Sequence, residues 1–194
     1  MKASPIRPDE RRLMAERRGV GVRASETALL SYDLTVVATE TSDVVAGAGG
    51  WLYDRVRAGW KVNVVVPVSC DVRPLEILGV QARHAGRDAG DLPAEPAALA
   101  VPARLFAVDQ GLRRHVTEAL RRGTAEVTMW GPCATADVGY RVDRVQYRLS
   151  TAARAFKAHA LAAAGITTAV ANVEQFHSCA LWYPSDGPDL TAVR

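Results

Sequence analysis

The sequence has few cysteines and few lysines, and it lacks any long apolar run. Its three cysteines are widely spaced and form no C-x-x-C pair, which excludes a disulfide framework and is typical of a reducing compartment. No apolar run reaches the roughly 18 residues that a membrane-spanning helix needs. The opening stretch, MKASPIRPDERR, has no apolar core of the kind found in a secretory signal. We therefore expect a cytoplasmic protein with no membrane partner.

The sequence also lacks a complete motif for any common chemistry. It contains no G-x-x-x-x-G-K-[ST] for phosphate binding, and no recurrent His and Cys spacing of the zinc-binding kind. The glycines of GAGG, residues 47–50, fall inside an expected helix and not directly after a strand, so they do not match the dinucleotide fingerprint. Close packing of that helix explains them better. The sequence thus predicts no metal ligands, identifies no cofactor and leaves open whether the protein is an enzyme.

The charge is placed unevenly along the 194 residues. Residues 1–23 hold seven basic against three acidic side chains, a surplus of +4 within a chain whose net charge is +3. We expect residues 1–25 to form a basic flexible arm and residues 26–194 to form one domain. Because that domain is close to neutral, we expect no nucleic-acid partner for its body.

Short apolar stretches alternate with helical patterns from residue 28 onward. Residues 30–38 and 61–68 are apolar on both faces, as strands covered on both sides are. Between them, apolar residues recur at spacing four until Gly59 ends the expected helix. The pattern predicts two adjacent parallel strands joined by a right-handed crossover helix.

The remaining chain repeats this alternation less clearly. We expect further strands near residues 79–84, 124–131 and 166–176, a long irregular connection over 85–103, and one helix over 142–164. The predicted fold class is α/β, a single three-layer Rossmann-like domain with a mostly parallel sheet of about five strands.

Polar and reactive residues follow the ends of the predicted strands, where open parallel sheets bind ligands. Asp43 in particular is expected to cap the first helix. The residues that we expect to bind a ligand are Thr39, Glu40, Ser42, Asp43, Cys70, Asp71, Cys133 and His177. The main hypothesis is a cytoplasmic binding or regulatory protein that takes a small polar or anionic ligand at this edge, with no catalytic residue identified.

One stretch resembles a known family. TETSDVVAGAGGWLYDRVRAGWKVNVVV, within residues 30–68, is similar to the opening of the LmbE/PIG-L zinc-dependent N-acetyl sugar deacetylases, where a Rossmann-like strand precedes a His-Pro-Asp-Asp-Glu turn and a helix with Gly-Ala-Gly-Gly. On that pattern Glu40 stands at the metal-binding histidine, Ser42 at the catalytic aspartate and Asp43 at the metal-binding aspartate. Val44 replaces the glutamate, and the family's later His-rich motif is absent. The resemblance implies a remodelled site, because a serine cannot replace a carboxylate as general base.

Two alternatives remain beside the main hypothesis. The first is a metal-dependent, deacetylase-like hydrolase with an altered ligand set of Glu40, Asp43 and His177. The second is an oligomeric interaction protein whose basic arm contacts nucleic acid or an acidic partner. Trp182 and Tyr183 in the C-terminal tail are suited to anchor that tail on the body or on a second subunit, so a homo-oligomer is left open.

Overall fold

A computed structural model describes residues 32–85, 97–123, 125–132, 142–179 and 190–193. The predicted arm, Cys133, Trp182 and Tyr183 lie outside these residues. The helices and strands in chain order are β1 (Asp33–Val37), α2 (Thr41–Arg57), β2 (Lys61–Val66), α3 (Arg73–Ile77), β3 (Gln81–His84), β4 (Ala98–Pro102), α4 (Ala103–Val108), α5 (Gln110–Arg122), β5 (Glu126–Trp130), β6 (Asp143–Arg148), α7 (Thr151–Ala163), β7 (Val173–Ser178) and β8 (Thr191–Ala192). The α/β class is therefore confirmed.

All the described strands belong to one mixed sheet with the order β3-β2-β1-β4-β5-β7-β6-β8. The five strands from β3 to β5 run parallel, whereas β7 pairs antiparallel with β5 and with β6, and β6 pairs antiparallel with β8. The expectation of about five strands is therefore corrected to eight strands in the described part of the chain.

The first strand pair matches its prediction closely. β1 and β2 are parallel neighbours, in a register from Asp33 opposite Lys61 to Val37 opposite Val65. Valine and leucine side chains of both strands are buried, which is why the apolar pattern was informative. The predicted strand at 79–84 and the strand before Gly131 are also present, as β3 and β5.

Three predictions downstream need correction. The single helix expected over 142–164 is a strand, β6, followed by α7 from Thr151, with Ser150 as the N-cap that accepts a hydrogen bond from the Ala153 N–H at 3.0 Å. The expected irregular connection contains β4, which is buried along its whole length. The last parallel-sheet strand expected at 166–176 is β7, which begins only at Val173 and runs antiparallel to β5.

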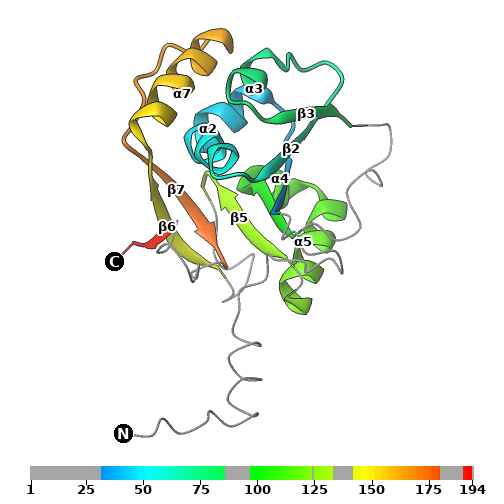
Figure 1. Ribbon diagram of the computed structural model, residues 1–194. Coiled ribbons are helices and arrows are strands. Elements are labelled where there is room, and N and C mark those ends of the chain that lie inside the picture. The colour runs from blue at the N-terminus through cyan, green and yellow to red at the C-terminus, as the bar shows by residue number, and fades with distance from the viewer. Residues whose placement is uncertain (1–31, 86–96, 124, 133–141, 180–189, 194) are drawn as a thin grey trace, which may run out of the picture.

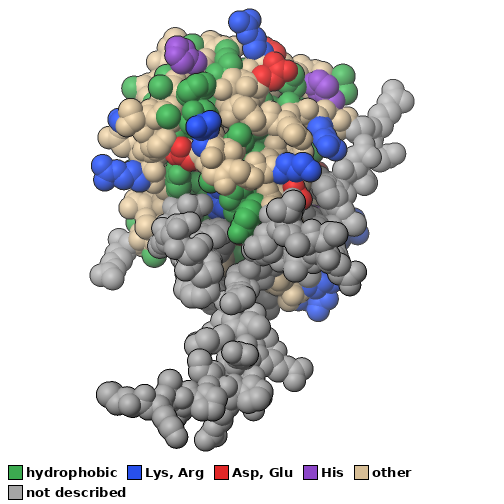
Figure 2. Space-filling view, viewed as in Figure 1, with side chains coloured by type: hydrophobic (Ala, Val, Ile, Leu, Met, Phe, Trp, Pro, Cys, Tyr) green, Lys and Arg blue, Asp and Glu red, His purple; other side chains and the backbone are tan. Residues whose placement is uncertain are grey.

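Helices cover both faces of the sheet (Figure 1). α2, α3 and α7 lie on one face, where they share a core with β1 and β2 that includes Trp51, Leu52 and Phe176. α4 and α5 lie on the other face, where Phe106 and Val116 pack against β4 and β5. None of the described helices is long and apolar enough to cross a membrane. On the face drawn in Figure 2, basic and acidic side chains are dispersed over neutral surface.

The small residues of α2 allow neighbouring side chains to touch the helix backbone. A Cβ atom on Gly47 would stand 2.1 Å from the Trp130 ring, and one on Gly50 would stand 2.1 Å from Leu149 Cδ2. Both distances are far inside van der Waals contact. The packing explanation of the GAGG stretch is therefore confirmed.

We predict that Gly50→Ala destabilises the protein, although alanine favours a helix over glycine. The new methyl group must displace the buried Leu149, an overpacking that costs about 1–3 kcal/mol and exceeds the helix gain of about 1 kcal/mol. Gly49→Ala is the matched control, because its Cβ would come no closer to a neighbouring side chain than 3.3 Å, at Leu78 Cδ1. Urea unfolding should show a lower midpoint for Gly50→Ala than for Gly49→Ala; equal midpoints would contradict the close approach.

Candidate functional site

The site lies at the carboxyl ends of β1 and β4, where the helices that follow these strands go to opposite faces of the sheet. β1 and β4 are adjacent parallel strands, yet β1 leads into α2 on one face and β4 leads into α4 on the other. Such a point in an open parallel sheet leaves a crevice at the carboxyl ends of the strands, which is the usual place for a ligand. The residues that follow β1 and β4 meet there.

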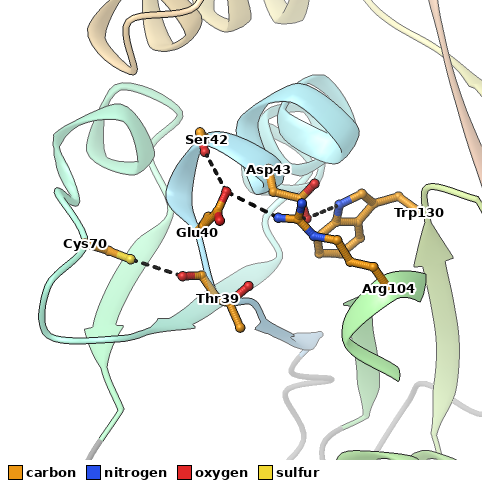
Figure 3. Close-up of polar contacts among 7 residues, drawn as sticks. All are labelled: Thr39, Glu40, Ser42, Asp43, Cys70, Arg104 and Trp130. Carbon is orange, nitrogen blue, oxygen red and sulfur yellow. Dashed lines mark hydrogen bonds and ion pairs between the residues drawn. The ribbon is translucent and has the colours of Figure 1, made fainter. Parts of the chain in front are cut away.

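A guanidinium group lies between two carboxylates at this point (Figure 3). Arg104, in the first turn of α4, approaches Glu40 Oε2 at 3.4 Å and Asp43 Oδ2 at 3.5 Å through the same nitrogen, Nη2. The side chains of Arg104 and Glu40 are 52% and 62% exposed, whereas Asp43 is 22% exposed. Two carboxylates and one guanidinium leave the cluster with a net negative charge, open to solvent on the Glu40 side.

Asp43 does not cap its helix as the sequence predicted. The N-cap is Glu40, whose side chain makes no capping hydrogen bond, and Asp43 is a residue of the first helical turn. Its Oδ2 accepts a hydrogen bond of 3.1 Å from the indole Nε1 of Trp130, at the end of β5. The indole can reach Asp43 because Gly47 leaves room for the ring. Asp43 therefore joins α2 to the sheet instead of satisfying its own backbone.

A cavity of about 870 Å³ opens beside Asp43 and Trp130. It extends between α2, the end of α7 and β7, along the segment from Ile166 to Ala171. Its polar lining comes from Asp43, Arg144, Lys157, Thr168, Glu174, Gln175 and His177, and its apolar lining includes Trp130, Leu161, Ile166, Val170 and Phe176.

A buried ion pair forms one wall of this cavity. Lys157 of α7 and Glu174 of β7 are each 5% exposed and pair directly. Glu174 accepts hydrogen bonds from the backbone N–H groups of Gly50 and Trp51, at 2.9 and 2.8 Å, and Lys157 donates to the backbone oxygen of Ala46 at 2.7 Å. Burial raises the pKa of Glu174, while the Lys157 ammonium and the two N–H groups act in the opposite direction. The pair thus links the middle of α2 to α7 and to β7.

The residues predicted from the sequence fall into two places. Glu40, Ser42, Cys70 and Asp71 line a smaller hollow of about 300 Å³, near the end of α7. Thr39 does not line that hollow, but its backbone oxygen accepts a hydrogen bond from Cys70 Sγ at 3.4 Å. Asp43 and His177 line the larger cavity instead. Cys133 lies outside the described residues.

Sequence reasoning missed Arg104, Trp130 and the Lys157–Glu174 pair. No local signal marked them, because each acts across the fold on a partner that is distant in sequence. The cysteine at the end of β7 carries no sign of reactivity: Cys179 Sγ accepts a hydrogen bond from the Val127 N–H, and burial raises the pKa of the thiol.

The described residues do not fit a bound metal ion. The alternative ligand set of Glu40, Asp43 and His177 is not assembled, since no group of three or more His, Cys, Asp or Glu side chains within the described ranges could hold a metal. Glu40 and Asp43 are instead bridged by the Arg104 cation, which supplies positive charge but no lone pair.

Comparison with solved structures shows what this fold is similar to. No protein-family model and no curated protein matches the chain. A triple mutant of a deacetylase of the teicoplanin biosynthetic pathway aligns with a TM-score of 0.52 at 13% identity, over 75% of this chain and 96% of that one. A complex of such a deacetylase with teicoplanin gives 0.51 at 12% identity, over 75% and 97% of the two chains. Another teicoplanin-pathway deacetylase complex gives 0.50 at 14% identity, over 67% and 82%.

These likenesses concern the fold. The structural neighbours are LmbE/PIG-L-like deacetylases, so the resemblance read from residues 30–68 is confirmed at that level. The deacetylases share their fold with this chain, whereas the donor set of the described residues does not supply a metal site.

We predict that Lys157→Met lowers the free energy of unfolding by about 3–5 kcal/mol, because it leaves the Glu174 carboxylate buried without its cation. The double variant Lys157→Met, Glu174→Gln should recover part of this loss, since no charge is then buried. Lys61→Met, at an exposed position of β2, is the control and should stay near the wild-type value. Urea unfolding measures all three. A Lys157→Met protein as stable as the control would contradict the role of the pair.

Proposed function

We propose that this chain is a small-ligand-binding protein built on a deacetylase-like α/β fold, which takes a hydroxyl-bearing ligand at the Glu40–Arg104–Asp43 cluster. The observation that carries the proposal is the guanidinium between the two carboxylates. A Rossmann-like assignment of the fold belongs to the same proposal, supported by the parallel order β3-β2-β1-β4-β5.

The chemistry of the cluster favours a neutral polar ligand there. Arg104 makes only long contacts with Glu40 and Asp43, so its other N–H groups are available as donors. The carboxylates supply acceptors beside it, and Ser42 bonds to Glu40 at 3.4 Å. A hydroxyl group can both donate and accept, whereas an anion would meet the net negative charge of the cluster.

The fold comparison supports a second candidate, a metal-dependent hydrolase of an N-acetyl group. The structural neighbours of this chain are deacetylases, and the alignment covers nearly the whole length of two of them. For this candidate to hold, the metal must take ligands from outside the described residues, because the described His, Cys, Asp and Glu side chains form no group that could hold it. The two candidates therefore differ in an observable quantity, the metal content of the purified protein.

The remaining expectations stay predictions. A cytoplasmic location, a homo-oligomer and a basic arm that contacts nucleic acid or an acidic partner are each supported only by the sequence. Salt dependence of any nucleic-acid binding, measured with and without residues 1–23, tests the arm.

We predict less than about one-tenth equivalent of zinc per chain after purification without added metal, since Arg104 holds the position between the carboxylates. Incubation with N-acetylglucosamine, followed by NMR, should then release no acetate. Zinc near one equivalent that is lost in Asp43→Asn, together with acetate release by the wild type, would make the hydrolase the better account.

We predict that the wild type binds N-acetylglucosamine or glucose weakly, and that Arg104→Gln reduces this binding about tenfold, as loss of charge-assisted hydrogen bonds does. Arg114→Gln, at an exposed position of α5, is the control for a lost positive charge. Titration followed by NMR shifts provides the dissociation constants. Equal effects of the two substitutions would remove Arg104 from the site.

A further inference from the structure

β5 and β7 lie side by side in the sheet, but β7 extends beyond the end of β5 (Figure 1). The ladder between them stops at Trp130 opposite Phe176, whereas β6 stays paired with β7 as far as Val173. Within the described ranges, residues 173–175 therefore have a neighbouring strand on one edge only. The chain leaves the ladder at Gly131, whose φ is 87°, and a Cβ atom on this glycine would meet no atom within 4 Å beyond its chain neighbours. We call this interruption of the sheet, beside residues 173–175, the β7 notch.

The backbone of β7 directs hydrogen-bonding groups into the β7 notch. Along an antiparallel strand, alternate residues direct their N–H and C=O groups to the same neighbour. The backbone oxygen of Asn172 accepts a hydrogen bond of 3.0 Å from the Leu149 N–H, on the β6 side, and the Cys179 N–H bonds to β5 at 3.1 Å. Val173 and Gln175 alternate with Asn172, so their backbone groups point to the side on which β5 has ended. A strand edge without a neighbour is a template for another strand.

The larger cavity lies along the β7 notch and is lined from both faces of the sheet. On the α2 and α7 face its wall is apolar, with Leu161 of the core and with Ile166 and Val170, which pack against that core. On the opposite face Arg144 and His177 line it, in register with a residue of the core under α4 and α5. Successive side chains of a strand point to opposite faces, so a strand in the notch would contact the apolar wall and the polar face in turn.

We infer that an extended peptide binds in the β7 notch as an antiparallel strand that continues the ladder of β5. Its residue opposite Glu174 points to the α2 and α7 face and is apolar, because that wall is aliphatic. Its residues opposite Val173 and Gln175 point to the polar face, and their backbone groups form the hydrogen bonds to β7. Peptides that add to a sheet edge are recognised in this way, with main-chain bonds for affinity and a pocket for alternate side chains. The volume of about 870 Å³ is within the range of ligand-binding cavities.

The test uses the full chain and the blocked peptide acetyl-Ser-Ser-Leu-Ser-Ser-amide. With the leucine opposite Glu174, the two adjoining serines direct their N–H groups to β7. N-methylation of both serines removes these donors and should weaken binding about tenfold, whereas N-methylation of the leucine, whose N–H points away from β7, should change it by less than about twofold. Replacing the leucine by serine should weaken binding about tenfold, through loss of apolar contact. NMR titration gives the dissociation constants.

Hydrogen exchange locates the bound peptide. Binding should slow exchange of the Val173 and Gln175 amides, while the amide of Glu174, which faces β6, changes little. Val170→Asp should weaken binding about tenfold, because it puts a charge on the apolar wall. Val68→Asp is the matched control, at a position that is 73% exposed and does not line the cavity.

The peptide series uses the unaltered protein, so its outcome does not depend on how the variants fold. Equal effects of the serine and leucine N-methylations, no peptide binding at millimolar concentration, or protection at β3 or β8 in place of β7 would each overturn the inference. A dimer in sedimentation that the peptide leaves intact, with residues 173–175 protected, would show a second copy of the chain in the notch and overturn it too. Arg104→Gln should leave the peptide's affinity unchanged, which separates this result from failure of the proposed function.

Discussion

The carboxylate of Glu174 fixes where helix α2 lies, and most of the site depends on that position. It bonds to two backbone N–H groups in the middle of α2, while its partner Lys157 bonds to a carbonyl of the same helix. α2, α7 and β7 are thereby held together by Lys157 and Glu174, which are each only 5% exposed and would be costly to leave unpaired. The Asp43 carboxylate at the start of α2 is placed by this arrangement, as is one wall of the larger cavity.

At the carboxyl ends of β1 and β4, the protein uses a side-chain cation. Arg104 between Glu40 and Asp43 balances charge in a half-exposed position, where ion pairs contribute little to stability. The fold is similar to that of deacetylases, yet the described residues at this edge present two carboxylates around a guanidinium and no group that could hold a metal. A shared fold and a different donor set coexist because the loops at the strand ends carry the chemistry.

Local patterns were informative where a segment's own side chains decide its structure. β1 and β2 were predictable because their segments are apolar on both faces, and the end of α2 because Gly59 follows it. The small residues of α2 are explained by the side chains that pack against them. β4 was hidden because Ala98–Pro102 contains alanine and proline, and β6 because Val142, Val145 and Leu149 also fit a helical spacing. Arg104 and Trp130 could not be predicted, since their contacts with Asp43 depend on the order of the strands, which no local pattern encodes.

The Glu174 contact also has a consequence for synthesis of the chain. Glu174 lies 124 and 123 positions after Gly50 and Trp51, so the hydrogen bonds from α2 cannot form until β7 has been synthesised. At roughly 5–20 residues per second, the ribosome needs on the order of ten seconds to make that stretch. Meanwhile a glycine-containing helix and the adjoining apolar strands have emerged without their cover. Until β7 has been made, the amino-terminal half therefore keeps apolar surface exposed that the finished molecule buries.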